Sequence, residues 1–158
     1  MPTIERLALA VLILASLGSL GLAFTVQYGL GYAPCSLCVL ARWPHAAVVV
    51  LGGLAFAKGW YRAGLGLAMA ALLAAFAISL RHVGVEAGWL PLPDSCRVPD
   101  ETGGLDQLRG AMLAQTQPAC DIEGPSVLGL TMAAWHALAA ATLALVAASV
   151  LSRGSERR

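Results

Sequence analysis

Residues 7–26 read LALAVLILASLGSLGLAFTV, a run without a charged side chain. As an α-helix, a run of this length crosses the roughly 30 Å hydrocarbon core of a bilayer. Three further apolar runs follow, at about residues 37–57, 63–80 and 127–151. A lone strand would leave its backbone groups unpaired in lipid. The sequence therefore predicts four transmembrane helices.

The composition also indicates a membrane protein. Hydrophobic residues make up 58% of the 158-residue chain and charged residues 12%, whereas soluble domains carry about 25% charged residues. We expect a single domain over residues 1–158. Its predicted fold is an all-α four-helix transmembrane bundle with a long, mostly irregular outer loop, and we expect no nucleic-acid partner. The first run is longer than the roughly 7–15 apolar residues of a cleaved signal peptide, so we expect it to remain as a helix.

Charge is distributed unevenly along the chain. Basic residues gather at the N-terminus, in the turn 58–62 and in the C-terminal tail, whereas the loop at about 82–126 is acidic through Glu86, Asp94, Asp100, Glu101, Asp106, Asp121 and Glu123. The positive-inside rule places the basic turn and both termini in the cytoplasm. The loops at about 27–36 and 82–126 are then the outer ones, and all four cysteines lie at or beyond the outer face of the membrane.

The long outer loop contains one candidate for regular structure. Leu105, Leu108 and Met112 recur at helical spacing with polar residues between them, which predicts a short amphipathic helix on the membrane surface. An ordinary capped loop helix fits the same pattern.

Cys35 and Cys38 form a C-x-x-C pair where the first outer loop enters the second apolar run. Residues three apart share a helix face, so the two sulfurs can reach each other. A helix N-terminus favours the thiolate form of a cysteine. Arg42 follows one turn later, where its charge would stabilise a thiolate or an anionic acceptor. The alternative is that Arg42 extends to the lipid headgroups from a helix end.

Cys96 and Cys120 lie in the long outer loop. If joined, they close a loop of about 25 residues, which contributes roughly 3–4 kcal/mol in the chain-entropy estimate. Such a disulfide can be a structural staple. The flanking residues Pro93 and Pro99 instead predict an extended, accessible segment, and an accessible disulfide is the exchangeable kind.

We expect no resident metal. Structural zinc sites use two close-spaced pairs, and Cys96 and Cys120 are 24 positions apart. Covalent haem needs a histidine directly after the second cysteine of C-x-x-C, where this chain has Val39.

The stretch PCSLC at residues 34–38, with Arg42 after it, resembles the P-C-x-L-C-x-x-x-R signature of the disulfide bond formation protein B (DsbB) family of bacterial quinone reductases. Cys96 and Cys120 match the loop pair of that family. In the related vitamin K epoxide reductases the loop cysteines precede the C-x-x-C, and here they follow it.

Two further stretches carry the resemblance. His82, Glu86 and the pair GW at 88–89 are similar to the end of the family's third span, and LGLTM at 128–132 resembles the start of its fourth. There are departures: Ala41 stands where some members have an acidic residue or glutamine, and Glu86 where some have glutamine. Pro44 lies inside the second predicted span and should kink it.

The resemblance implies a protein-disulfide oxidoreductase of the bacterial inner membrane. By this analogy, a reduced thioredoxin-fold protein similar to DsbA forms a mixed disulfide with Cys96, and Cys120 acts as the resolving or relay partner. Electrons then pass to Cys35 and Cys38, and a thiolate at Cys38 reduces a membrane quinone, ubiquinone or menaquinone. The same analogy places Arg42 and His82 at the quinone.

Several residues near this proposed site are ambiguous. His82 can equally be a satisfied interfacial histidine, and Glu86 reads most simply as an exposed loop acid. We interpret His45 and His136 as packing residues. Two alternatives to the general quinone-linked relay stay open: a tetraspan scaffold or assembly factor whose disulfides only staple its outer loop, and an oxidase dedicated to one partner.

Overall fold

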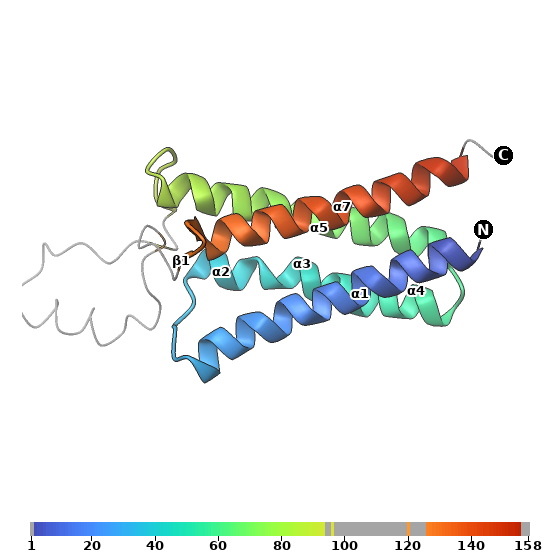
Figure 1. Cartoon of the computed structure of the whole chain (residues 1–158), viewed down its shortest axis with the longest axis horizontal. Coiled ribbons are helices and arrows are strands. Elements are labelled where there is room, and N and C mark those ends of the chain that lie inside the picture. Colours follow the sequence, from blue (N-terminus) through green and yellow to red (C-terminus); the bar gives the residue numbers. More distant parts are fainter. Residues whose placement is uncertain (1, 94–95, 97–119, 121–125, 156–158) are drawn as a thin grey trace, which may run out of the picture.

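The computed structural model describes residues 2–93, 96, 120 and 126–155. Within this part of the chain, four helical segments are long and apolar enough to cross a membrane: Thr3–Gly29, Ser36–Ala57, Tyr61–Glu86 and Met132–Arg153. They pack side by side, with both termini at one end of the bundle (Figure 1). The predicted four-helix transmembrane bundle is confirmed. The predicted amphipathic helix around Leu105 lies outside the described residues.

The first segment is helix α1 (Pro2–Phe24), which continues into the π-helical turn η1 (Thr25–Gly29). The second is made of α2 (Ser36–Leu40), α3 (Arg42–Ala47), the π-helical turn η2 (Val48–Gly52) and α4 (Gly53–Ala57). Its break at Ala41 lies just before Pro44, whose missing N–H removes a hydrogen bond to the residue four positions earlier. The interruption expected from Pro44 is therefore present.

The third segment, α5 (Tyr61–Glu86), runs past the predicted end near residue 80. It ends in a Schellman motif. Gly88 adopts a left-handed conformation with φ of 70°, and the N–H of Trp89 donates to the carbonyl of Gly84 at 2.8 Å. His82 and Glu86, which the sequence placed in the outer loop, therefore lie on the last turns of this helix.

The fourth segment, α7 (Met132–Ser155), starts later than the predicted residue 127. Strands β1 (Ser126–Val127) and β2 (Leu130–Thr131) form a small antiparallel hairpin instead. The two residues between the strands, Leu128 and Gly129, have φ values of 54° and 78°. Positive φ at both positions is the geometry of a tight two-residue hairpin turn and is incompatible with a right-handed helix.

The end of the bundle that carries the termini is held by an apolar core and one polar cluster. Leucines of α1 and α5 interlock with alanines of α7, and Gly64 allows close approach, because a Cβ there would lie 2.7 Å from Leu9 Cδ2. Nearby, Arg62 pairs with Glu5 at 3.2 Å and donates to the carbonyl of Leu151 at 3.1 Å. These contacts join α1, α5 and α7.

A chain of polar side chains crosses the bundle between this core and the opposite end. His45 Nε2 lies 2.7 Å from His136 Nε2, and His45 Nδ1 lies 3.3 Å from the hydroxyl of Ser16. The other ring nitrogen of His136 hydrogen-bonds Ser79, whose hydroxyl donates to the carbonyl of Ala75. The two histidines were interpreted as packing residues. His45 is buried and His136 is half-buried, and they also connect α1, α3, α5 and α7 by hydrogen bonds.

Candidate functional site

Cys35 and Cys38 lie at the start of α2, which stands at the end of the bundle opposite the termini (Figure 1). Cys35 is extended, with φ of −71° and ψ of 169°, and caps α2, where its sulfur accepts the N–H of Cys38 at 3.2 Å. This bond satisfies one of the N–H groups that a first helical turn leaves unpaired. The two thiols are free and their sulfurs lie 2.8 Å apart. A disulfide of about 2.05 Å needs only a small further approach.

The electrostatics of the pair favour a thiolate at Cys35. A hydrogen bond from the Cys38 thiol lowers the pKa of Cys35, burial of the sulfur opposes this, and His82 and the Cys38 N–H lower the pKa further, so that it lies well below its usual range. His82 Nε2 is 3.6 Å from the Cys35 sulfur. The family resemblance implies that Cys38 is the reactive thiolate, and that role stays a prediction. The backbone N–H and the imidazole are directed at Cys35.

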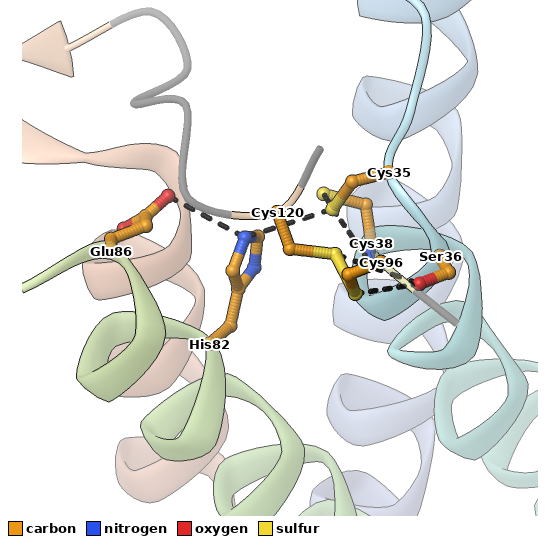
Figure 2. Close-up of a disulfide and its surroundings, with 7 residues drawn as sticks. All are labelled: Cys35, Ser36, Cys38, His82, Glu86, Cys96 and Cys120. Carbon is orange, nitrogen blue, oxygen red and sulfur yellow. Dashed lines mark hydrogen bonds and ion pairs between the residues drawn. A yellow bond between two sulfur atoms is a disulfide. The ribbon is translucent and has the colours of Figure 1, made fainter. Parts of the chain in front are cut away.

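The Cys96–Cys120 disulfide packs directly against this dithiol. Ser36, between the two cysteines of the C-x-x-C, places its hydroxyl 2.9 Å from Cys96 Sγ and 3.5 Å from Cys120 Sγ. Figure 2 shows the disulfide between Ser36 and His82. The exposed fractions of Cys96 and Cys120 are 4% and 0%. The predicted accessibility of this disulfide was therefore wrong for this state, because the disulfide packs into an apolar cluster with Cys35, Leu37 and Val85.

His82 connects the two cysteine pairs to α7. Its ring contacts Cys35, hydrogen-bonds the backbone of Cys120 and lies 3.5 Å from Glu86 Oε1, one turn along α5. Glu86 Oε2 accepts the hydroxyl of Thr131 at 2.7 Å, and Thr131 in turn caps the start of α7. The Glu86 side chain is only 6% exposed. The interpretation as an exposed loop acid was wrong, because α5 extends far enough to carry Glu86 on the same face as His82.

Arg42 lies one turn after Cys38 and is held from two sides. Its Nη1 donates to Gln27 Oε1 at 2.6 Å, and its guanidinium carbon lies 5.0 Å from the ring centroid of Phe24. Its Nε is buried and has no acceptor among the described residues. A fixed guanidinium whose N–H groups are not all paired can bind a polar ligand atom. The contacts of Gln27 with Arg42 and of Ser36 with Cys96 were not predicted from the sequence. The signal that could have indicated them was a polar side chain next to an apolar run.

This arrangement of a dithiol packed on a disulfide is suited to thiol–disulfide exchange. The model of one protein family, described as disulfide bond formation protein DsbB, matches residues 5–150. The chain belongs to the DsbB family. The chain therefore has a role in disulfide-bond formation. This is the same family that the sequence motifs resemble.

Named relatives agree with this assignment. Disulfide bond formation protein B of Verminephrobacter eiseniae is 31% identical, covering 94% of this chain and 87% of the relative. The protein of the same name from Cupriavidus necator is 28% identical, with 83% of each chain covered. That of Chromohalobacter salexigens is 31% identical, covering 84% of this chain and 82% of the relative. No solved structure matches the chain.

Proposed function

We propose that the chain is a quinone-reducing protein-disulfide oxidoreductase. It reoxidises a periplasmic thioredoxin-fold protein similar to DsbA and passes the electrons to ubiquinone or menaquinone in the bacterial inner membrane. The observation that supports this most strongly is the packing of the Cys96–Cys120 disulfide on the free thiols of Cys35 and Cys38. A disulfide that only stapled a loop would not need a second cysteine pair beside it.

Each exchange balances. A thiolate of the partner attacks Cys96, the Cys96–Cys120 bond breaks, and Cys120 leaves as a thiolate. The second thiol of the partner then displaces Cys96, so that the partner departs as a disulfide and two electrons remain on Cys96 and Cys120. Exchange with a Cys35–Cys38 disulfide moves both electrons inward. In this proposal, a chain with Cys96–Cys120 oxidised and Cys35 and Cys38 reduced is at the stage after this transfer.

Arg42 and His82 are the residues that we assign to the quinone. The unused Nε of Arg42 can donate to a carbonyl oxygen, and His82, beside Cys35, can move a proton between sulfur and acceptor. A quinone is the electron acceptor, since it takes up two electrons and two protons while the Cys35–Cys38 disulfide closes. Its isoprenoid tail favours the lipid that surrounds the spans.

The proposed orientation follows from the basic residues. Arg6 lies near the start of α1, Lys58 and Arg62 lie where α4 ends and α5 begins, and Arg153 lies in the last turn of α7. These helix ends are at the end of the bundle that carries the termini (Figure 1). By the positive-inside rule this end faces the cytoplasm, which leaves the cysteines at the periplasmic face.

Two double variants and two reductants test the proposal in membranes that contain quinone. In Cys96→Ser/Cys120→Ser, a reduced thioredoxin-fold protein should no longer drive quinone reduction, whereas a small dithiol should still reduce Cys35–Cys38 directly. In Cys35→Ser/Cys38→Ser, both reductants should fail. Ser152→Ala, at the other end of the bundle, is the control and should match the unaltered chain.

Two results would overturn the proposal. Normal oxidation of the protein partner by the Cys96→Ser/Cys120→Ser variant would show that the relay order is wrong. An unaltered chain whose count of labelled thiols is the same with and without quinone would be a stapled scaffold. Activity with one thioredoxin-fold protein and not with others would identify a dedicated oxidase.

A further inference from the structure

Three soft ligand atoms meet at the end of α2. Cys35 Sγ, Cys38 Sγ and the ring nitrogen of His82 all lie within 4.8 Å of one another, and both thiols are free. We propose that this cluster, in its dithiol state, binds a thiophilic divalent cation of the Zn²⁺ type, and that closing the Cys35–Cys38 disulfide removes the site. The inference concerns the dithiol alone and does not depend on which electron acceptor the chain uses.

The distances suit such an ion. Bonds of about 2.3 Å to sulfur and about 2.0–2.1 Å to nitrogen in a tetrahedron place sulfur and nitrogen about 3.6 Å apart, and two sulfurs about 3.8 Å apart. Cys35 Sγ and His82 Nε2 lie 3.6 Å apart already. The sulfurs of Cys35 and Cys38 lie 2.8 Å apart, so they must separate by about 1 Å. Rotation of one cysteine side chain supplies a movement of that size.

The surroundings of His82 also suit a ligand. The ring hydrogen-bonds the backbone of Cys120, and a second contact of this kind commonly orients a metal-bound imidazole. A metal at Nε2 takes the place of that nitrogen's contact with Glu86. Two thiolates and one divalent cation have no net charge, which favours burial at the edge of the membrane. Three protein ligands leave the fourth position of a tetrahedron for water.

Binding is an acid–base step without electron transfer. The Cys38 thiol loses its proton to solvent, Cys35 binds as the thiolate that its surroundings favour, and two sulfur–metal bonds form. Because both sulfurs are then held as metal-bound thiolates, the Cys35–Cys38 disulfide cannot close. The cation is therefore an inhibitor that acts only on the dithiol state. This differs from the structural zinc that the spacing of the four cysteines argued against, since the ligands are one cysteine pair and His82.

The test titrates Cd²⁺ into the full chain in detergent, with the Cys96–Cys120 disulfide intact and two thiols per chain mapped to Cys35 and Cys38. We expect one Cd²⁺ per chain, detected by its sulfur-to-metal absorption and displaced by Zn²⁺. The chain with both disulfides closed should bind none. His82→Ala should weaken binding by at least about tenfold, whereas His136→Gln, a control at a half-buried histidine outside the cluster, should leave the affinity unchanged.

Equal Cd²⁺ binding by the disulfide form, or an unchanged affinity in His82→Ala, would overturn the proposal, as would one ion shared between two chains. If His82→Ala does not fold, the unaltered chain still decides. Zn²⁺ should protect Cys35 and Cys38 from maleimide, and a chelator should reverse the protection. Unprotected thiols at saturating Zn²⁺ would refute the site. None of these readouts needs quinone or a protein partner, so they are independent of the proposed relay.

Discussion

The hydrogen bonds that His45 and His136 make can each be assigned a direction from the structure alone. The Ser79 hydroxyl donates to the carbonyl of Ala75 at 2.8 Å, so its oxygen is left to accept the Nδ1–H of His136. Nε2 of His136 is then the acceptor for the Nε2–H of His45, and Nδ1 of His45 accepts the hydroxyl of Ser16. With both histidines neutral, every ring nitrogen and hydroxyl in this row of hydrogen bonds has a partner.

This assignment gives the cost of removing either ring. His136→Leu leaves the Nε2–H of His45 buried without an acceptor, which costs about 1–3 kcal/mol. His45→Leu leaves the Nε2 lone pair of His136 without a donor, at a similar cost. The double variant removes both groups and should cost less than the two single variants added together. We expect a coupling of about 1–2 kcal/mol, near the upper end of measured interhelical values in membranes.

The free energy of unfolding can be measured by reversible unfolding in mixed micelles with SDS, followed by helical circular dichroism. Measured on the unaltered chain, the two single variants and the double variant, it gives the coupling as a double-mutant cycle. Thr142→Ala and Ser149→Ala form the matched control, because both hydroxyls are exposed and bond only within α7. Their effects should be small and additive. A coupling between His45 and His136 below about 0.3 kcal/mol, within the usual error of additivity, would refute the hydrogen-bond chain.

Three further predictions concern the functional site. With a chelator present, the ultraviolet absorbance of the Cys35 thiolate should titrate below the roughly 8.5 of a free cysteine, and His82→Ala should raise that pKa; equal titrations near the free value would contradict the assignment. Because the folded pKa is the lower one, ionisation of Cys35 stabilises the folded dithiol above the unfolded pKa, and this is lost as pH falls through the folded pKa. Glu86→Leu should lower thermal stability by about 1–2 kcal/mol because it leaves the Thr131 hydroxyl without its acceptor, while Glu86→Gln should stay within about 0.5 kcal/mol; equal losses would count against the hydrogen bond. Arg42→Ala should raise the apparent KM for quinone about tenfold and Gln27→Leu by less, and an unchanged KM in Arg42→Ala would make Arg42 a headgroup anchor.

The four spans and the proximity of Cys35 and Cys38 could be predicted from the sequence because their signals are local. An uncharged run of about 20 residues has few other stable states than a membrane helix. A C-x-x-C three positions apart on a helix must bring its sulfurs together. Arg42 was identified as a candidate site residue because a charge inside an apolar run is costly and therefore unusual. Each of these inferences needs only neighbouring residues.

The errors arose where packing between distant segments decides the outcome. Leu128 has a backbone conformation that leucine rarely adopts, and no propensity rule would start α7 after it rather than before it. Glu86 looked exposed because the predicted third span ended too early. His45 and His136 are 91 positions apart in the chain, so neither reveals its partner. The burial of the disulfide depends likewise on contacts with α2 and α5.

The burial of Cys96 places a condition on the proposed relay. A thiolate on another protein must approach this sulfur along the S–S bond, and with 4% of the residue exposed that approach is closed. The contacts with Ser36 and with His82 must therefore separate for exchange with the partner and re-form for exchange with Cys35 and Cys38. In the described state the electrons lie on the inner pair while the outer disulfide is covered. The covered disulfide cannot accept further electrons from the partner until these contacts separate, so their separation is a required step of the proposed relay.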